Sequence, residues 1–108
     1  MTEALQILGL ARRAGAVAPG TAATRRSISQ GEARLVLMAE DASSAQLDKI
    51  RRTMRRRIIP QVLLGDRRTL GAAIGKAPIT AVAVTDASLA GRLLESIDGE
   101  IMVDEGRD

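Results

Sequence analysis

The sequence contains no histidine, no cysteine and no aromatic residue. Histidine is the usual proton shuttle near neutral pH, cysteine is the usual thiolate nucleophile, and together they supply most zinc ligands. We therefore expect no enzymatic activity, no catalytic residue, no metal site and no cofactor. Without Phe, Tyr or Trp, the chain also lacks the aromatic platforms on which single-stranded nucleic acids commonly stack their bases.

Long apolar runs are missing as well. No stretch approaches the roughly 18 residues of a membrane span, and residues 1–11 lack the basic start and cleavage site of a secretory signal. We expect a cytoplasmic protein with no membrane association. Hydrophobic residues make up 45% of the chain and none of them carries a ring, which suits helices packed in thin layers on a sheet.

Arginine, in contrast, is abundant. It supplies 14 of the 16 basic residues, and 13 acidic residues leave a net charge of +3. Residues 95–108 hold six acids and one arginine, so residues 1–94 hold fifteen bases and seven acids, a net charge of +8. Guanidinium groups recognise phosphate, guanine edges and folded RNA, so this basic part indicates a polyanionic partner without specifying its shape.

A length of 108 residues corresponds to one domain. We place this domain at residues 1–97 and interpret residues 98–108 as an acidic C-terminal tail, since chain ends are usually poorly ordered unless they are held in place. The apolar cluster Ile101–Val103 leaves an edge strand as the alternative for this segment.

Two segments with the same pattern predict an α/β fold. The apolar runs Leu35–Ala39 and Ala81–Val84 have the length of buried strands, and each is followed by acidic and hydroxyl residues that can cap a helix. Strands buried on both faces need helices on both sides, so we expect a three-layer α/β/α sandwich. The remaining predicted elements are helices over 4–13, 21–31, 47–54, 66–74 and 86–97 and short strands over 17–19 and 61–64.

Three motifs have local structural explanations. Gly71–Lys76 has three residues between its glycines and Ala77 after the lysine, whereas a Walker A phosphate loop needs four residues and Ser or Thr. The arginine run 51–57 lies off the apolar side of its helix, so we interpret it as a solvated face or at most a non-specific phosphate contact. Glu40, Asp41 and Asp86 are interpreted as helix caps rather than as metal ligands or acid/base groups.

The segment Pro19–Arg26 is harder to explain by structure alone. A glycine at a helix start brings backbone amides and the positive end of the helix dipole close to an anion, and Arg25 and Arg26 lie one turn further along. An RNA-facing edge and an ordinary exposed helix remain equally open from the chemistry of these residues.

Several motifs taken together resemble a known family. They are Leu8–Gly15, Gly20, Gly31, Leu35–Ser43, Leu70–Lys76 and Ala81–Asp86. In order and spacing they are similar to the kink-turn RNA-binding ribosomal proteins of the L7Ae/L30e type, especially the small bacterial YlxQ-like members. The resemblance spans residues 4–97 and implies a central four-stranded mixed sheet and recognition of kink-turns, which are sharply bent RNA duplexes with tandem sheared G·A pairs.

The resemblance also implies which residues contact RNA. The start of the second helix would enter the RNA groove, and the loop after the fourth helix would pack against an extruded nucleotide. These segments correspond to Gly20, Thr21, Ala22, Ala23, Arg25 and Arg26 and to Lys76, Ala77, Pro78 and Ile79. Ala22 and Ala23 stand where archaeal and eukaryotic members carry Asn and Glu, which read guanine edges, whereas Arg26 keeps the positive charge of the family's lysine.

Two functional hypotheses follow. The first is a non-catalytic, monomeric RNA-binding protein that recognises a kink-turn or a related bent element in ribosomal or regulatory RNA, on its own or with the ribosome. The alternative is a ribosome-associated or protein-interaction module of the same fold in which specific RNA recognition is weakened, as Ala22 and Ala23 suggest.

Overall fold

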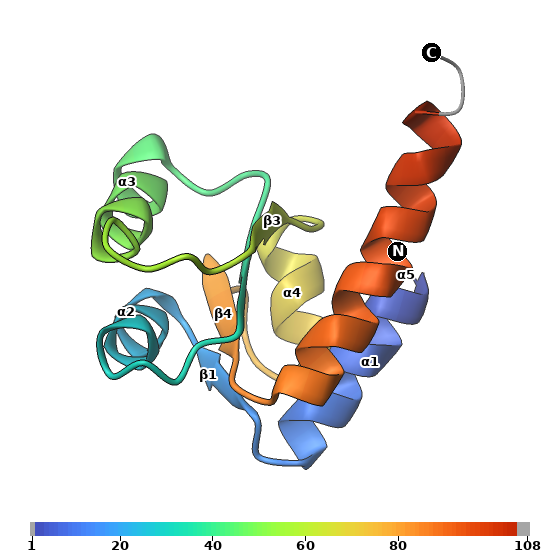
Figure 1. Ribbon diagram of the computed structural model, residues 1–108, viewed down its shortest axis with the longest axis horizontal. Helices are drawn as coiled ribbons and strands as arrows, with labels where there is room; N and C mark the ends of the chain where they lie inside the picture. Colours follow the sequence, from blue (N-terminus) through green and yellow to red (C-terminus); the bar gives the residue numbers. More distant parts are fainter. Residues whose placement is uncertain (1, 106–108) are drawn as a thin grey trace.

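A computed structural model describes the backbone of residues 2–105 and the side chains of residues 2–97. Helices and strands alternate along the chain (Figure 1). The helices are α1 (Thr2–Arg13), α2 (Thr21–Ser29), α3 (Ser44–Thr53), α4 (Arg67–Ala73) and α5 (Ala87–Glu105), and the strands are β1 (Val17–Pro19), β2 (Leu35–Met38), β3 (Gln61–Leu63) and β4 (Ala81–Val84).

The four strands form one mixed sheet in the order β1-β4-β2-β3. The strand β4 pairs antiparallel with both β1 and β2, whereas β2 and β3 are parallel. In this register Leu37 lies beside Val82 on one side and Val62 on the other. The four-stranded mixed sheet implied by the family resemblance is therefore confirmed.

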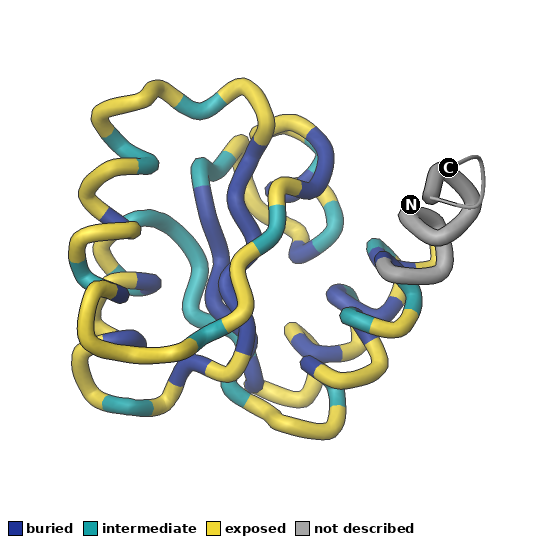
Figure 2. The backbone as a smooth tube through the Cα atoms, turned by 45° about the horizontal axis from the view of Figure 1, so that its top comes forward, coloured by how far each residue is buried: buried dark blue, intermediate teal, exposed yellow. Residues whose placement is uncertain are grey.

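Successive residues of the two central strands supply two separate cores. Leu35, Leu37, Val82 and Val84 belong to the core under α1, α4 and α5, and the alternate residues Val36, Met38, Ala81 and Ala83 belong to the core under α2 and α3. The two helix layers lie on opposite sides of the sheet in Figure 1, and Figure 2 shows the buried strands between them. The predicted three-layer α/β/α sandwich is confirmed.

The helix α2 has a narrow contact with the sheet. Its buried residues are Thr24, Ser27 and Ile28, of which only Ile28 is a large apolar side chain. The Thr24 hydroxyl donates to the Ala18 carbonyl oxygen at 3.2 Å. The helix ends in a Schellman motif, because Gly31 adopts a φ of 77° and its N–H donates to Ile28 O at 3.1 Å. Most of the remaining helix surface is accessible to a partner.

Three helices begin with a side-chain cap of the kind that their sequences favour, whereas the acidic pair Glu40 and Asp41 does not cap the helix that follows it. Ser43, Asp66 and Asp86 accept from the N–H groups of the third residue that follows each of them. Glu40 and Asp41 follow β2 and were expected to cap the next helix, but neither of them caps α3. Asp41 instead accepts from the Arg67 N–H at 2.8 Å, and its carboxylate lies 3.6 Å from Arg67 Nε. The sheet brings the end of β2 next to the start of α4, so the carboxylate satisfies an amide there.

The Asp66 cap predicts a pH dependence of stability. Hydrogen bonds from the backbone and side chain of Thr69, helped by the charge of Arg68, lower the pKa of Asp66 below its ordinary value. Its stabilising contribution is therefore complete above the unfolded-state pKa of about 4 and is lost as the pH falls through the lower folded-state pKa. In Asp66→Asn the amide oxygen can still cap the helix. Urea unfolding of both proteins across this pH range should show their difference in stability shrinking in acid, and a difference independent of pH would contradict the prediction.

The C-terminal helix is longer than expected. Helix α5 continues from Ala87 to Glu105, past residue 98 at which the acidic tail was predicted to begin, and residues 101–103 are helical rather than an edge strand. Residues 106–108 of the predicted tail lie outside the described residues, and the division of the chain at residue 97 stays a prediction. Within the described part of the chain, no helix is long and apolar enough to cross a membrane.

Candidate nucleic-acid interface

The two segments implicated by the family resemblance meet at one edge of the sheet, namely the end at which β1 finishes and β4 begins. The antiparallel pairing of β1 and β4 places the start of α2 beside the loop that enters β4, and the Gly20 N–H donates to Ala81 O at 2.8 Å. On the other side of the same loop, the Ala39 N–H donates to Thr80 O at 2.8 Å. The loop 76–79 is therefore held beside the first turn of α2.

The first turn of α2 presents backbone amides without a side-chain cap. Gly20 is the N-cap residue, with φ 93° and ψ 163°, a conformation that is almost confined to glycine. The first intrahelical bond runs from the Thr24 N–H to Gly20 O, so the amides of residues 21–23 precede the helical ladder. No side chain accepts from them within the described structure, and they lie at the positive end of the helix dipole. This end of the helix is suited to an anion.

The two arginines of α2 have different surroundings. Arg25 Nε donates to Thr53 Oγ1 at 3.0 Å, and that hydroxyl in turn donates to Lys49 O at 3.0 Å, so Arg25 is directed toward α3. Arg26 is exposed, and no hydrogen bond involves its side chain among the described residues. It lies one helical turn beyond Ala22, which is also exposed. Of the two arginines, Arg25 is engaged with α3, whereas no hydrogen bond among the described residues holds the side chain of Arg26.

The loop 76–79 is positioned by the end and the start of α4. The Lys76 N–H donates to Gly71 O at 2.8 Å, and the Ile79 N–H donates to Arg67 O at 3.1 Å. Lys76, Ala77 and Pro78 are exposed, whereas the half-buried Ile79 packs on the core beneath them. The apolar surface that the loop offers to a partner is therefore formed mainly by residues 77 and 78.

Comparison with known proteins assigns the chain to a family. The model of the ribosomal protein L7Ae/L30e/S12e/Gadd45 family matches residues 2–93. The chain belongs to this family. Its membership confirms the expectation of a non-enzymatic protein, and its fold agrees with that of related structures.

Individual proteins of known sequence or structure are similar to this chain. The RNA-binding protein YlxQ of Bacillus subtilis is 36% identical over 96 residues, which cover 89% of this chain and 96% of YlxQ. A Bacillus halodurans protein of unknown function has a TM-score of 0.85 and 31% identity, covering 91% of this chain and 99% of the other. The 15.5 kD RNA binding protein of Giardia lamblia shares the fold, with a TM-score of 0.71, 19% identity and coverage of 92% and 84% of the two chains.

Two basic residues at this edge of the L7Ae-type fold were not among those predicted from the sequence. Arg67 and Arg68 open α4, and together with Asp41, Asp66 and Pro78 they line a hollow of about 370 Å³ beside the loop 76–79. Arg67 is neutralised by Asp41, whereas Arg68 is exposed. The sequence shows only that two arginines follow a capping aspartate. Their place beside the starts of α2 and α3 depends on the strand directions, because β2 and β3 are parallel and β4 is antiparallel to both β1 and β2. Arg68 therefore adds a cation to the candidate interface.

Proposed function

We propose that this protein binds structured RNA at the sheet edge formed by the start of α2 and the loop 76–79, and that a kink-turn is the RNA it prefers. One observation carries the proposal: the uncapped amides after Gly20 and the exposed loop 76–79 adjoin through the bond from the Gly20 N–H to Ala81 O. Membership of the L7Ae/L30e/S12e/Gadd45 family and the similarity to an RNA-binding protein of Bacillus subtilis support it.

Each part of the edge has a distinct role in this proposal. The amides that follow Gly20 bind a phosphate, and Arg26 reaches into the groove from the next turn. Lys76 contacts a second phosphate, and Ala77 and Pro78 form a small apolar surface for an unstacked nucleotide. Phosphate contacts position the RNA, whereas its bent shape provides the specificity.

The two alanines of α2 set the strength of recognition. Ala22 and Ala23 donate no side-chain hydrogen bond, and each missing charge-assisted contact costs about 1.5–3 kcal/mol relative to a member that makes it. Binding then depends on amides and cations, so we propose an affinity that falls steeply with salt.

The test is a titration of a labelled kink-turn RNA and a matched straight duplex at moderate salt. We expect the kink-turn to bind at least tenfold more tightly, and Arg26→Ala to weaken its binding by about tenfold or more through the loss of one charge-assisted contact. Arg92→Ala is the matched control, because it removes the same charge from α5 on the opposite face of the sheet. Equal affinities for the two RNAs would contradict the specific claim and favour the protein-interaction module.

A further inference from the structure

A second basic surface lies at the other end of α2. The turn between α3 and β3 carries Arg55, Arg56 and Arg57 back toward the C-terminal end of α2, where Arg57 Nη2 donates to Ser29 O at 3.0 Å. A Cβ atom at Gly31 would lie only 3.3 Å from Arg57 Nη1, so the guanidinium packs directly over the glycine. The arginine run is therefore not only a solvated face, because Arg57 is held in one position.

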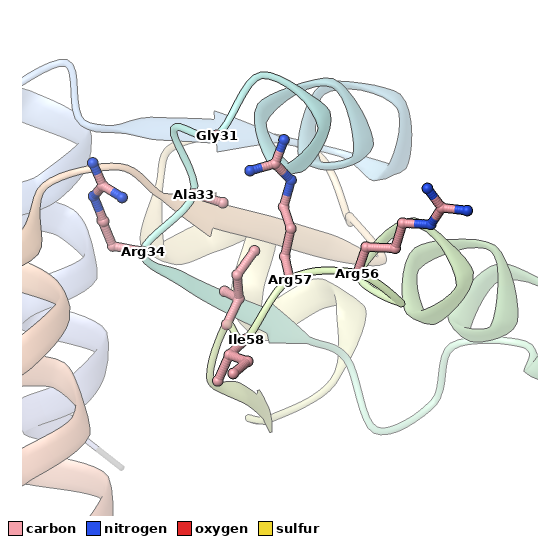
Figure 3. A pocket seen from close by; sticks show the side chains of 7 residues that line it. Gly31, Ala33, Arg34, Arg56, Arg57 and Ile58 are labelled. Atoms are coloured by element: carbon pink, nitrogen blue, oxygen red, sulfur yellow. The ribbon is translucent and has the colours of Figure 1, made fainter.

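This turn and the segment before β2 enclose a hollow of about 370 Å³. Figure 3 shows Arg34 and Arg57 on either side of it, with Arg57 extended toward the end of α2. Backbone bonds fix both walls: the Arg34 N–H donates to Val84 O at 2.8 Å, and the Val36 N–H donates to Pro60 O at 3.0 Å. We call this space the arginine hollow, and its lining residues are Gly31, Ala33, Arg34, Arg56, Arg57, Ile58 and Ile59.

The charges around the arginine hollow are not neutralised by any residue whose side chain the structure describes. Among the residues whose side chains the structure describes, Arg34, Arg56 and Arg57 form no salt bridge. A second hollow shares Arg56 and Arg57 and adds Arg52 and Arg55, so the basic surface continues along the end of α3. Like charges gathered on a rigid surface create a strong local field for an anion.

An apolar residue completes the surface. Ile58 is fully exposed and lines the arginine hollow directly after Arg57 in the chain. A ligand that covers the Ile58 side chain removes its apolar surface from water, which is favourable. The planar faces of guanidinium groups also stack on flat rings. Arginines beside an exposed isoleucine match a nucleotide, whose phosphate is anionic and whose base has an apolar face. At the lower end of the roughly 300–1,000 Å³ of small-molecule sites, the volume suits one nucleotide rather than a duplex.

The position of the hollow connects it to the proposed RNA interface. Helix α2 has nine residues and is therefore about 13.5 Å long, with the candidate interface at its start and the arginine hollow at its end. A strand that leaves the bent RNA can follow α2 over this distance.

We propose that the arginine hollow binds an unpaired nucleotide that flanks the structured RNA, with Arg34, Arg56 and Arg57 on its phosphates and Ile58 against its base. This inference rests on the proposed function in that the chain binds RNA, but it involves a different set of residues. It assigns the densest basic run of the sequence to single-stranded RNA.

The experiment compares a blunt-ended kink-turn RNA with the same RNA carrying a short single-stranded extension on either strand. We expect the extension to tighten binding about tenfold. In Arg34→Ala/Arg56→Ala that gain should disappear. The negative slope of log affinity against log salt should become less steep by about 1.4, because each of two lost phosphate contacts on a single strand contributes about 0.7. Binding of the blunt RNA should be unchanged. The double variant keeps the bond from Arg57 to Ser29 O and thus the local fold.

Two further variants sharpen the test. Ile58→Ser should weaken binding of the extended RNA about fivefold without changing the salt slope, because it removes apolar contact and no charge. Arg13→Ala/Arg92→Ala removes two arginines from α1 and α5 in the opposite layer and should leave the gain from the extension intact.

The outcomes separate this inference from the proposed function. An extension that adds no affinity, or equal losses for blunt and extended RNA in the double variant, would overturn the arginine hollow and leave the proposed function standing. Equal binding of blunt kink-turn and straight duplex would overturn the kink-turn proposal alone. The hollow is then judged by the loss of single-stranded RNA binding in the double variant relative to the Arg13/Arg92 control. Tighter binding of an acidic peptide than of the extension would assign the hollow to a protein partner.

Discussion

Replacing Gly71 with alanine is expected to lower the free energy of unfolding by roughly 3 kcal/mol. A Cβ atom at this position would overlap the Ala77 carbonyl oxygen and lie 2.7 Å from its carbon and 2.9 Å from Lys76 O. These are backbone atoms of the loop 76–79, which is also held by the bond from the Lys76 N–H to Gly71 O. The loop must move away from α4 to accept the methyl group, and urea unfolding measures the cost.

Gly91→Ala provides the matched control for this substitution. Gly91 lies in α5, and an added Cβ would meet no atom of the described residues within 4 Å, so alanine there should stabilise the protein by about 0.5–1 kcal/mol through its higher helix propensity. If Gly71→Ala were as stable as the parent, the close approach of the loop to α4 would be wrong. Where the variant still folds, its displaced loop should also weaken binding of the kink-turn RNA, whereas Gly91→Ala should not.

Truncation of Ile28 has the second large expected effect. Ile28 is the only large apolar residue that α2 buries, and it is completely enclosed between that helix, the sheet and α3. Ile28→Ala removes this contact and leaves a cavity, so we expect the free energy of unfolding to fall by about 3 kcal/mol, within the range of 2–5 kcal/mol for such changes. Thermal or urea unfolding with an unchanged m-value would measure this loss.

The conservative change Ile28→Val should cost only about 0.5–1.5 kcal/mol. Because α2 buries no other large apolar side chain, the alanine variant should also loosen the helix. Amide exchange between residues 21 and 29 should then be faster than in the parent protein, by more than in the sheet. A small loss of stability, close to that of the valine variant, would mean that Thr24 and its bond to Ala18 O hold the helix without Ile28.

The layers of the fold were predictable because the central strands are strongly marked. The runs 35–39 and 81–84 are apolar at every position, and only burial on both faces makes such a strand stable. The cap at Asp86 was equally predictable, since a capping carboxylate accepts from an amide three residues away. Local rules of this kind depend only on residues that are neighbours in the chain.

The contacts that define the functional surfaces depend on residues far apart in sequence and could not be predicted in the same way. Asp41 lies next to a helix that it could have capped, but it bonds to Arg67, 26 residues away. Arg57 bonds to Ser29 O across 28 residues, which holds part of the arginine run against α2 although its side chains stay exposed. The family resemblance indicated the start of α2 and the loop 76–79, whereas Arg68 and the arginine hollow became visible only in three dimensions.

The order of the strands also affects how this protein behaves at high concentration. Both edges of the sheet are three-residue strands, β1 and β3, and β1 ends in Pro19, which has no N–H to donate. A long row of unpaired amides at a sheet edge is a template for pairing with another chain, and neither edge offers one. The sheet therefore resists growth by strand addition, so crowding of many copies along one RNA would not by itself lead to β-aggregation.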